Sequence, residues 1–152
     1  MPRTEIRLET FLPFRLNRLA AEVSRRLAVI YAERFGLDIP EWRVMATLSS
    51  RRTATAQEIV ASTRTHKSTI SRAVTTLKKR GLVEREDSSA DGREIVLRLS
   101  AAGHALMREI APLVLEGERA ILSRLPARPQ ALLLDVLSAL ESSLGLDEEE
   151  TS

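Results

Sequence analysis

The chain of 152 residues contains no cysteine, which excludes disulfide bonds, thiolate metal sites, cysteine nucleophiles and thiol-based redox sensing. Only two histidines occur, His66 and His104, so a histidine-rich metal site is not expected. The apolar runs are far shorter than the ~20 residues that cross a bilayer, and the first residues lack the apolar core of a secretory signal. We therefore expect a cytoplasmic protein with no membrane anchor and no cofactor.

Aromatic residues are scarce, and all of them lie in the first third of the chain. They are Phe11, Phe14, Tyr31, Phe35 and Trp42. Hydrophobic residues amount to 43%, which is enough to build a largely aliphatic core and excludes global disorder. The later part of the chain has no ring on which a base could stack, which counts against single-strand and RNA-binding modules.

Acidic residues are absent from the segment Thr63–Gly81, although the whole chain has a formal net charge of only +2. This segment holds six basic residues, Arg64, Lys67, Arg72, Lys78, Lys79 and Arg80. A segment of one sign indicates a polyanionic partner, and the lack of nearby rings favours duplex DNA. The alternative is a solvated helix face. Four acids at 147–150 form a tail that either solubilises the chain end or competes for the basic face.

The first third of the sequence predicts two helices. Apolar residues spaced three and four apart indicate a long helix over 10–36, for which Thr10 is the expected cap. Asp38 followed three residues later by Glu41 is typical of a second helix start. The polar, basic stretch 49–53 is expected to be a loop.

A helix-turn-helix is predicted next. Thr55 and Glu58 form a capping-box pattern that opens a short helix, and a tight turn follows at 62–64. Thr65 is expected to cap a helix over 66–80, which carries the positive charge. Two helices joined by three or four residues are typical of this motif.

Beyond Gly81 the apolar period changes to that of strands. Segments 82–85 and 94–99, separated by the Asp91-Gly92 turn signal, predict a β-hairpin or wing. Ser100 caps a long amphipathic helix, and a last helix is expected over 130–144, after Pro126 and Pro129.

The helix over 66–80 has two distinct sides when its residues are placed at about 100° intervals. Ile70, Val74 and Leu77 form the side expected to be buried. The other side combines cations with small hydroxyls, which suit base edges and phosphates. The candidate DNA contacts on and before this helix are Arg64, His66, Lys67, Ser68, Ser71, Arg72 and Thr75. For Lys78 and Lys79, interaction with the helix dipole is an equally good explanation.

Several motifs together resemble the MarR family of bacterial transcription regulators. They are Thr55-Ala56-Gln57-Glu58-Ile59, Lys67-Ser68-Thr69-Ile70-Ser71-Arg72, Leu77-Lys78-Lys79-Arg80-Gly81-Leu82-Val83-Glu84-Arg85, Asp91-Gly92-Arg93 and Leu97-Arg98-Leu99-Ser100-Ala101-Ala102-Gly103. The resemblance covers nearly the whole chain.

The resemblance implies a mainly α-helical homodimer with a small β-hairpin, in which each subunit carries a winged helix-turn-helix. It assigns 38–99 to the DNA-binding lobe, 10–36 and 101–145 to interlocking dimerisation helices, and 146–152 to an acidic tail. The helices over 66–80 would enter successive major grooves of a pseudo-palindromic operator. Arg93 would reach the minor groove while Asp91 holds the wing; an ordinary hairpin turn is the alternative for both residues.

Many members of this family are repressors that small anionic, often aromatic, ligands release from DNA. Such ligands bind between the dimer helices and the DNA-binding lobe. Tyr31 and Trp42, with the nearby Phe35, suit this pocket, and Arg15, Arg18 and Arg43 are candidate carboxylate partners. The alternative is that these rings are ordinary core residues.

Two other classes of function remain open. An enzyme would need a convergent nucleophile, base or metal site, and the two histidines lie in different elements. A winged helix could also serve only protein contacts or bind DNA without sequence preference. We expect a sequence-specific duplex DNA-binding repressor.

Overall fold

The structure, a computed structural model, describes residues 4–86 and 94–148. Its described part is mainly α-helical with one small antiparallel sheet, as predicted. In chain order the elements are η1 (Leu8–Thr10), α1 (Leu12–Phe35), α2 (Ile39–Arg51), β1 (Thr53–Thr55), α3 (Ala56–Thr63), α4 (Lys67–Lys79), β2 (Val83–Arg85), β3 (Val96–Leu99), α5 (Ala101–Leu122), α6 (Ala127–Ser143) and η2 (Leu146–Glu148).

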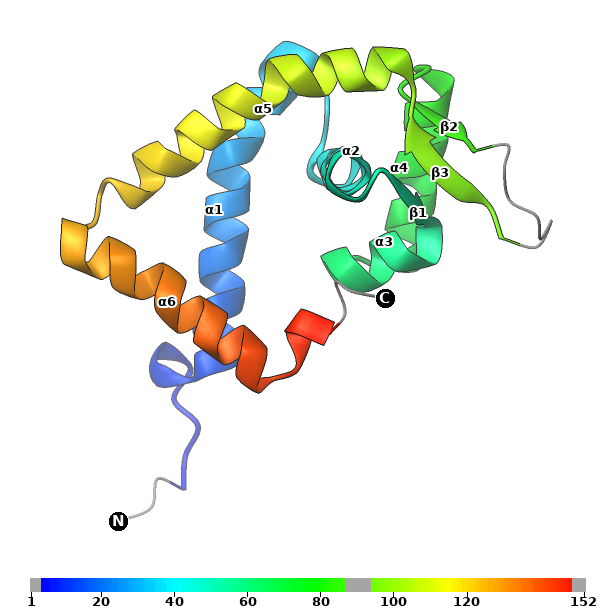
Figure 1. The fold of residues 1–152 in the computed structure, drawn as a ribbon. Coiled ribbons are helices and arrows are strands. Elements are labelled where there is room, and N and C mark those ends of the chain that lie inside the picture. The colour runs from blue at the N-terminus through cyan, green and yellow to red at the C-terminus, as the bar shows by residue number, and fades with distance from the viewer. Residues whose placement is uncertain (1–3, 87–93, 149–152) are drawn as a thin grey trace.

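Helices α2, α3 and α4 and the three strands gather into one lobe (Figure 1). The strand order is β1-β3-β2, with Ala54 opposite Leu97 and Val83 opposite Leu99. All four of these side chains are buried. The sheet therefore closes one side of the lobe's aliphatic core.

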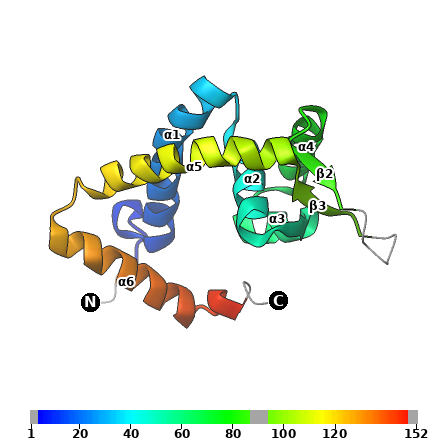
Figure 2. The same cartoon turned by 45° about the horizontal axis from the view of Figure 1, so that its top comes forward.

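Helices α1, α5 and α6 extend away from this lobe. Helix α5 starts beside the sheet and crosses α1, and α6 turns back from its far end (Figures 1 and 2). The apolar side chains of α6 remain open to solvent, with Leu132 49%, Leu134 54% and Val136 60% exposed. Much of α1 is exposed as well, including Leu12 and Leu19. A single chain thus leaves a large apolar surface uncovered.

The predicted caps of three helices are confirmed. The Asp38 side chain accepts the Glu41 N–H at 2.8 Å, and Thr55 accepts the Glu58 N–H at 3.2 Å. Ser100 starts α5 by accepting the Gly103 N–H at 3.0 Å. These local signals need no tertiary context, because each one satisfies backbone donors of its own first turn.

Two other helix starts differ from the prediction. Thr10 does not cap α1; it ends η1, and extended Phe11 is the N-cap. Thr65 does not cap α4; His66 does, through a ring Nδ1 that accepts the Ser68 N–H at 3.2 Å. The Thr65 hydroxyl is engaged elsewhere, as described below.

The stretch 49–53 is not a loop. Helix α2 continues to Arg51, and Thr53–Thr55 forms β1 against β3. The last helix also starts earlier than predicted, at Ala127, since Pro129 lies in its first turn, where a missing N–H costs no helical hydrogen bond. The partner of β1 is more than forty residues away in the sequence, so local patterns carry no signal for it.

The start of α5 lies in close contact with the chain that leaves α4. The Ser100 N–H donates to the Leu82 carbonyl at 3.0 Å, and the Ser100 hydroxyl donates to the Gly81 carbonyl. A Cβ added at Gly103 would lie 2.1 Å from the Leu82 carbonyl oxygen. Glycine is therefore required here by contact with backbone, which cannot rotate away as a side chain can.

We expect Gly103→Ala to lower the free energy of unfolding by about 1–3 kcal/mol, because overpacking outweighs the helix propensity gained, ~1 kcal/mol. Gly117→Ala in the same helix is the matched control, since its added Cβ would meet only the side-chain tips of Leu27 and Ile30. Urea denaturation of both variants measures the difference. Equal stability of the two variants would contradict the contact.

Candidate DNA-binding interface

The helix-turn-helix consists of α3 and α4, joined by Arg64, Thr65 and His66. Arg64 adopts a left-handed conformation with φ 51°, which reverses the chain between the two helices. Arg43 of α2 donates from Nη1 to the Thr65 hydroxyl at 3.0 Å and so ties this turn to the lobe. The start of α4 is thereby held from outside the motif.

Helix α4 divides into a buried and an exposed side. Ile70 and Leu77 are fully buried, and Val74 nearly so, as predicted; Ala73 joins them. Every candidate DNA contact that precedes or lies on α4 is exposed, namely Arg64, His66, Lys67, Ser68, Ser71, Arg72 and Thr75. The packing of α4 therefore presents the cationic, hydroxyl-bearing side to solvent.

Shallow hollows flank this exposed side. One, of about 240 Å³, lies between α3 and α4 and includes Gln57, Lys67 and Ser71. The other, of about 320 Å³, lies between α2 and α4 and includes Arg72 beside Asp38 and Glu41. Arg72 thus stands at the edge of the exposed side that is nearer to α2.

Arg80 behaves differently from the other basic residues of its segment. Its guanidinium donates to the main-chain carbonyls of Phe35 and Gly36 at 2.9 and 3.0 Å. In the sequence, Arg80 belongs to the basic segment that is predicted to bind a polyanion. No local signal distinguishes it from the other basic residues of that segment. The predicted wing residues Asp91 and Arg93 lie outside the residues that the structure describes.

The predicted ligand residues are only partly brought together. Tyr31 is buried and stacks on Trp42, with ring centroids 5.1 Å apart and planes 13° apart. Burial raises the pKa of Tyr31, and the nearby Arg43 charge partly offsets this. Arg15 and Arg18 lie on α1 about 20 Å or more from Tyr31, given a rise of about 1.5 Å per residue.

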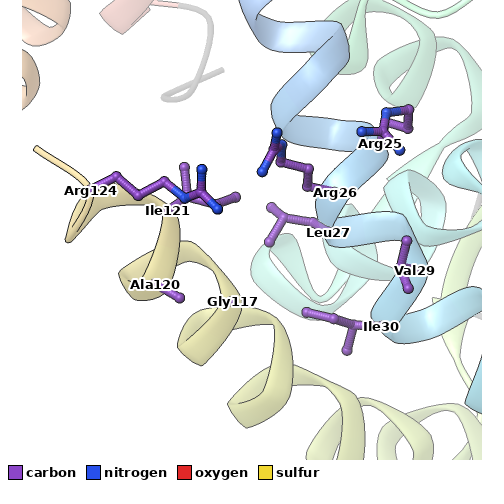
Figure 3. Close-up of a pocket in the computed structure, with 9 residues that line it drawn as sticks. All are labelled: Arg25, Arg26, Leu27, Val29, Ile30, Gly117, Ala120, Ile121 and Arg124. Atoms are coloured by element: carbon purple, nitrogen blue, oxygen red, sulfur yellow. The ribbon is translucent and has the colours of Figure 1, made fainter.

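A cavity that the sequence did not indicate lies between α1 and α5 (Figure 3). Its volume is about 460 Å³, and it is lined by apolar side chains and three arginines, Arg25, Arg26 and Arg124. Arg25 and Arg26 also hydrogen-bond to Glu22, which lowers the pKa of that carboxyl to about 2. Beside the cavity, Gly117 allows α5 to approach α1 closely, because an added Cβ would lie 2.6 Å from Ile30 Cδ1. The cavity forms only when two distant helices meet.

The fold and the exposed side of α4 define a winged helix-turn-helix protein of the transcription-regulator class. The MarR family model matches residues 35–94, which run from the end of α1 through β2 and stop before β3. A search of the curated proteins gives no significant match.

Solved structures with this fold belong to the same family. A MarR/EmrR family transcriptional regulator from Acinetobacter sp. ADP1 is 23% identical with a TM-score of 0.79, covering 93% of this chain and 99% of that one. A MarR family regulator from Streptomyces coelicolor, solved in complex with DNA, is 26% identical with a TM-score of 0.74, covering 95% and 92%. A MarR family protein from Mycobacterium tuberculosis, in complex with salicylic acid, is 24% identical with a TM-score of 0.73, covering 86% and 96%.

The resemblance carried by the motifs is confirmed: residues 35–94 match the MarR family model, and the chain has the fold of MarR family transcriptional regulators. Within residues 4–86 and 94–148, no helix has the length and apolar character needed to cross a bilayer.

Glu41 is the buried acid at the base of the hollow beside Arg72. It is 7% exposed, and its Oε1 accepts the Asp38 N–H at 3.2 Å. Burial raises the pKa of Glu41, and Arg80 partly counters this. The folded protein thus favours the protonated carboxyl more than the unfolded chain does, so ionisation of Glu41 lowers stability as the pH rises through its raised pKa.

We expect Glu41→Gln to raise the free energy of unfolding relative to the wild type more at pH 7 than at pH 4. The amide keeps an oxygen that can accept from Asp38 but carries no charge to bury. Denaturant titrations at the two pH values measure the difference. Glu58→Gln, at the same position of the exposed capping box of α3, is the control. A gain that does not change with pH would contradict the buried-charge explanation.

Proposed function

We propose that this protein is a homodimeric, sequence-specific duplex DNA-binding transcription repressor that acts in the cytoplasm and not as an enzyme. The observation that carries the proposal is the exposed side of α4, where cations and small hydroxyls alternate in an acid-free segment. Small side chains allow the helix to approach the floor of a major groove, and the cations neutralise phosphates.

Sequence-specific binding by this protein requires a dimer, because one helix supplies few base contacts. The uncovered apolar residues of α1 and α6 provide the surface for a second copy. Two recognition helices about 34 Å apart would meet successive major grooves on one face of the duplex. The S. coelicolor relative solved with DNA has the same fold over nearly the whole chain.

The exposed residues divide by their expected roles. Arg72 has the reach and the planar fork to bond guanine O6 and N7, and Ser68, Ser71 and Thr75 can contact bases or phosphates. Arg64 lies in the turn before α4, and His66 and Lys67 lie at its start; phosphate contacts are expected for all three. Arg93 stays our candidate for the minor groove, with Asp91 as its support.

A small aromatic or anionic effector completes the proposal. It would weaken DNA binding by its differential affinity for two arrangements of the lobes. Tyr31, Trp42 and Arg43 are one candidate site, with Arg15 and Arg18 as more distant partners. The cavity between α1 and α5 is the second, because its apolar walls and arginines suit an amphipathic anion (Figure 3). The relative bound to salicylic acid supports the choice of ligand class.

We expect Arg72→Ala to reduce the preference for a selected operator over random duplex by about 1–3 kcal/mol, while its affinity for random duplex changes little. Binding titrations over a range of salt concentrations measure both affinities. The wild type should show a steep linear fall of log K with log salt.

Thr76→Ala is the control for Arg72→Ala, because Thr76 of α4 borders the same hollow and is not among the candidate DNA contacts. It should leave operator preference unchanged. A flat salt response of the wild type would overturn DNA binding, and equal losses on both duplexes for Arg72→Ala would make Arg72 a phosphate contact.

We expect aromatic carboxylates to raise the melting temperature of the wild type in a thermal-shift screen, since a ligand that binds the folded state stabilises it. Arg43→Gln and Arg124→Gln separate the two candidate sites, because only the variant that removes the carboxylate partner should lose the shift. Aromatic amines of similar shape are the control ligands. A shift that survives both substitutions would exclude Arg43 and Arg124 as carboxylate partners.

A further inference from the structure

Arg80 joins the end of the recognition helix α4 to the end of α1. Its two terminal nitrogens donate to consecutive carbonyls, Phe35 at 2.9 Å and Gly36 at 3.0 Å. The last carbonyls of a helix lack intrahelical partners, and the helix dipole attracts a cation to this end. One side chain thereby closes the end of α1 and fastens α4 to it across more than forty residues of sequence.

The same end of α4 is also fastened to α5. The Ser100 hydroxyl donates to the Gly81 carbonyl, and the Ser100 N–H donates to the Leu82 carbonyl at 3.0 Å. Gly103 allows the first turn of α5 to approach the Leu82 carbonyl closely. Residues 80–82 therefore link the recognition helix to both α1 and α5, the two long helices that lead away from the lobe.

The position of Arg80 around α4 is also unlike that of a DNA contact. At about 100° per residue, Lys79 lies on the same side as Ser68, Arg72 and Thr75, whereas Arg80 points about 100° away from Lys79. Its guanidinium binds carbonyls through both branches of its fork. Two parallel bonds resist rotation between the helices in a way that a single ammonium contact cannot.

We propose that Arg80 is a positioning residue that sets the angle of α4 relative to α1, so that the dimer accepts operator half-sites at one spacing. The proposal rests on the proposed function, because half-site spacing has meaning only for a dimer with one recognition helix in each subunit. Arg80 itself does not contact DNA.

The first experiment selects bound sequences from a pool of duplexes with a randomised central segment. The proteins compared are the wild type, Arg80→Met, Arg80→Lys and the charge-loss control Lys79→Met. Wild type and Lys79→Met should each enrich half-sites at one spacing. Arg80→Met should enrich the same half-sites at several spacings, and its preference for the wild-type operator over one with an inserted base pair should fall about tenfold.

Salt dependence separates positioning from phosphate contact. Arg80→Met should keep the wild-type slope of log K against log salt, whereas loss of a phosphate contact lowers the slope by about 0.9. An unchanged preference for one spacing, or equal loss on operator and random duplex with a reduced slope, would overturn the proposal. If Arg80→Met fails to fold, Arg80→Lys keeps the charge without the fork and should show the same broadening to a smaller extent.

The second experiment does not depend on DNA. Because the chain has no cysteine, Lys78→Cys provides a single spin-label site in each subunit. Pulsed electron–electron double resonance should give a narrow distribution of distances between the two labels. Arg80→Met should broaden this distribution. Equal widths would overturn the positioning role. If the wild type enriches no duplex sequence, the proposed function fails, while the label distances still decide whether Arg80 orients α4.

Discussion

The burial of one side of α4 is the interaction on which the interface depends. Ile70 and Leu77 pack into the lobe core with α2, α3 and the sheet. This packing makes the opposite side of α4 face solvent. Burying side chains of this size stabilises the fold by about 1.5–3 kcal/mol each. A helix rotated by one residue would lose this packing and turn Arg72 and Ser68 away from the exposed side. The orientation of the polar side is therefore a consequence of core packing.

The lobe is well packed, but the chain as a whole is not. Helix α6 leaves Leu132, Leu134 and Val136 about half exposed, and residues 12–21 of α1 are all exposed. Such surface is stable in water only when it is covered, and a second copy of the chain offers a surface of the same kind. The proposed dimer thus follows from the same hydrophobic effect that forms the lobe, acting between chains.

Polar contacts fasten the lobe's helices at defined points. Arg43 holds the turn before α4 through Thr65, and Arg80 holds the end of α4 against α1. Arg43 also lies close enough to Tyr31 to affect its pKa. The aromatic pair and the end of α1 are therefore each linked by contacts to α4. A ligand could act through these contacts without touching DNA.

Much of this arrangement could be predicted because its signals are local. Capping residues such as Asp38, Thr55 and Ser100 satisfy donors within their own helix, and the apolar spacing of Ile70, Val74 and Leu77 identifies the buried side of α4. These features depend on residues three or four apart, so the sequence carries them directly.

Other features were decided by residues far apart in the chain. Strand β1 forms because it pairs with β3. The Thr65 hydroxyl accepts a hydrogen bond from Arg43, and His66 instead caps α4. The α1–α5 cavity lies where Gly117 meets Leu27. In the sequence Arg80 is one of several cations in a basic segment. In the structure the end of α1 places two carbonyls within hydrogen-bonding distance of its guanidinium. The sequence alone determined which helices form and which of their sides are apolar. Only the tertiary structure decided what Thr65 and Arg80 bind, because their hydrogen bonds depend on which distant groups the fold places within about 3 Å.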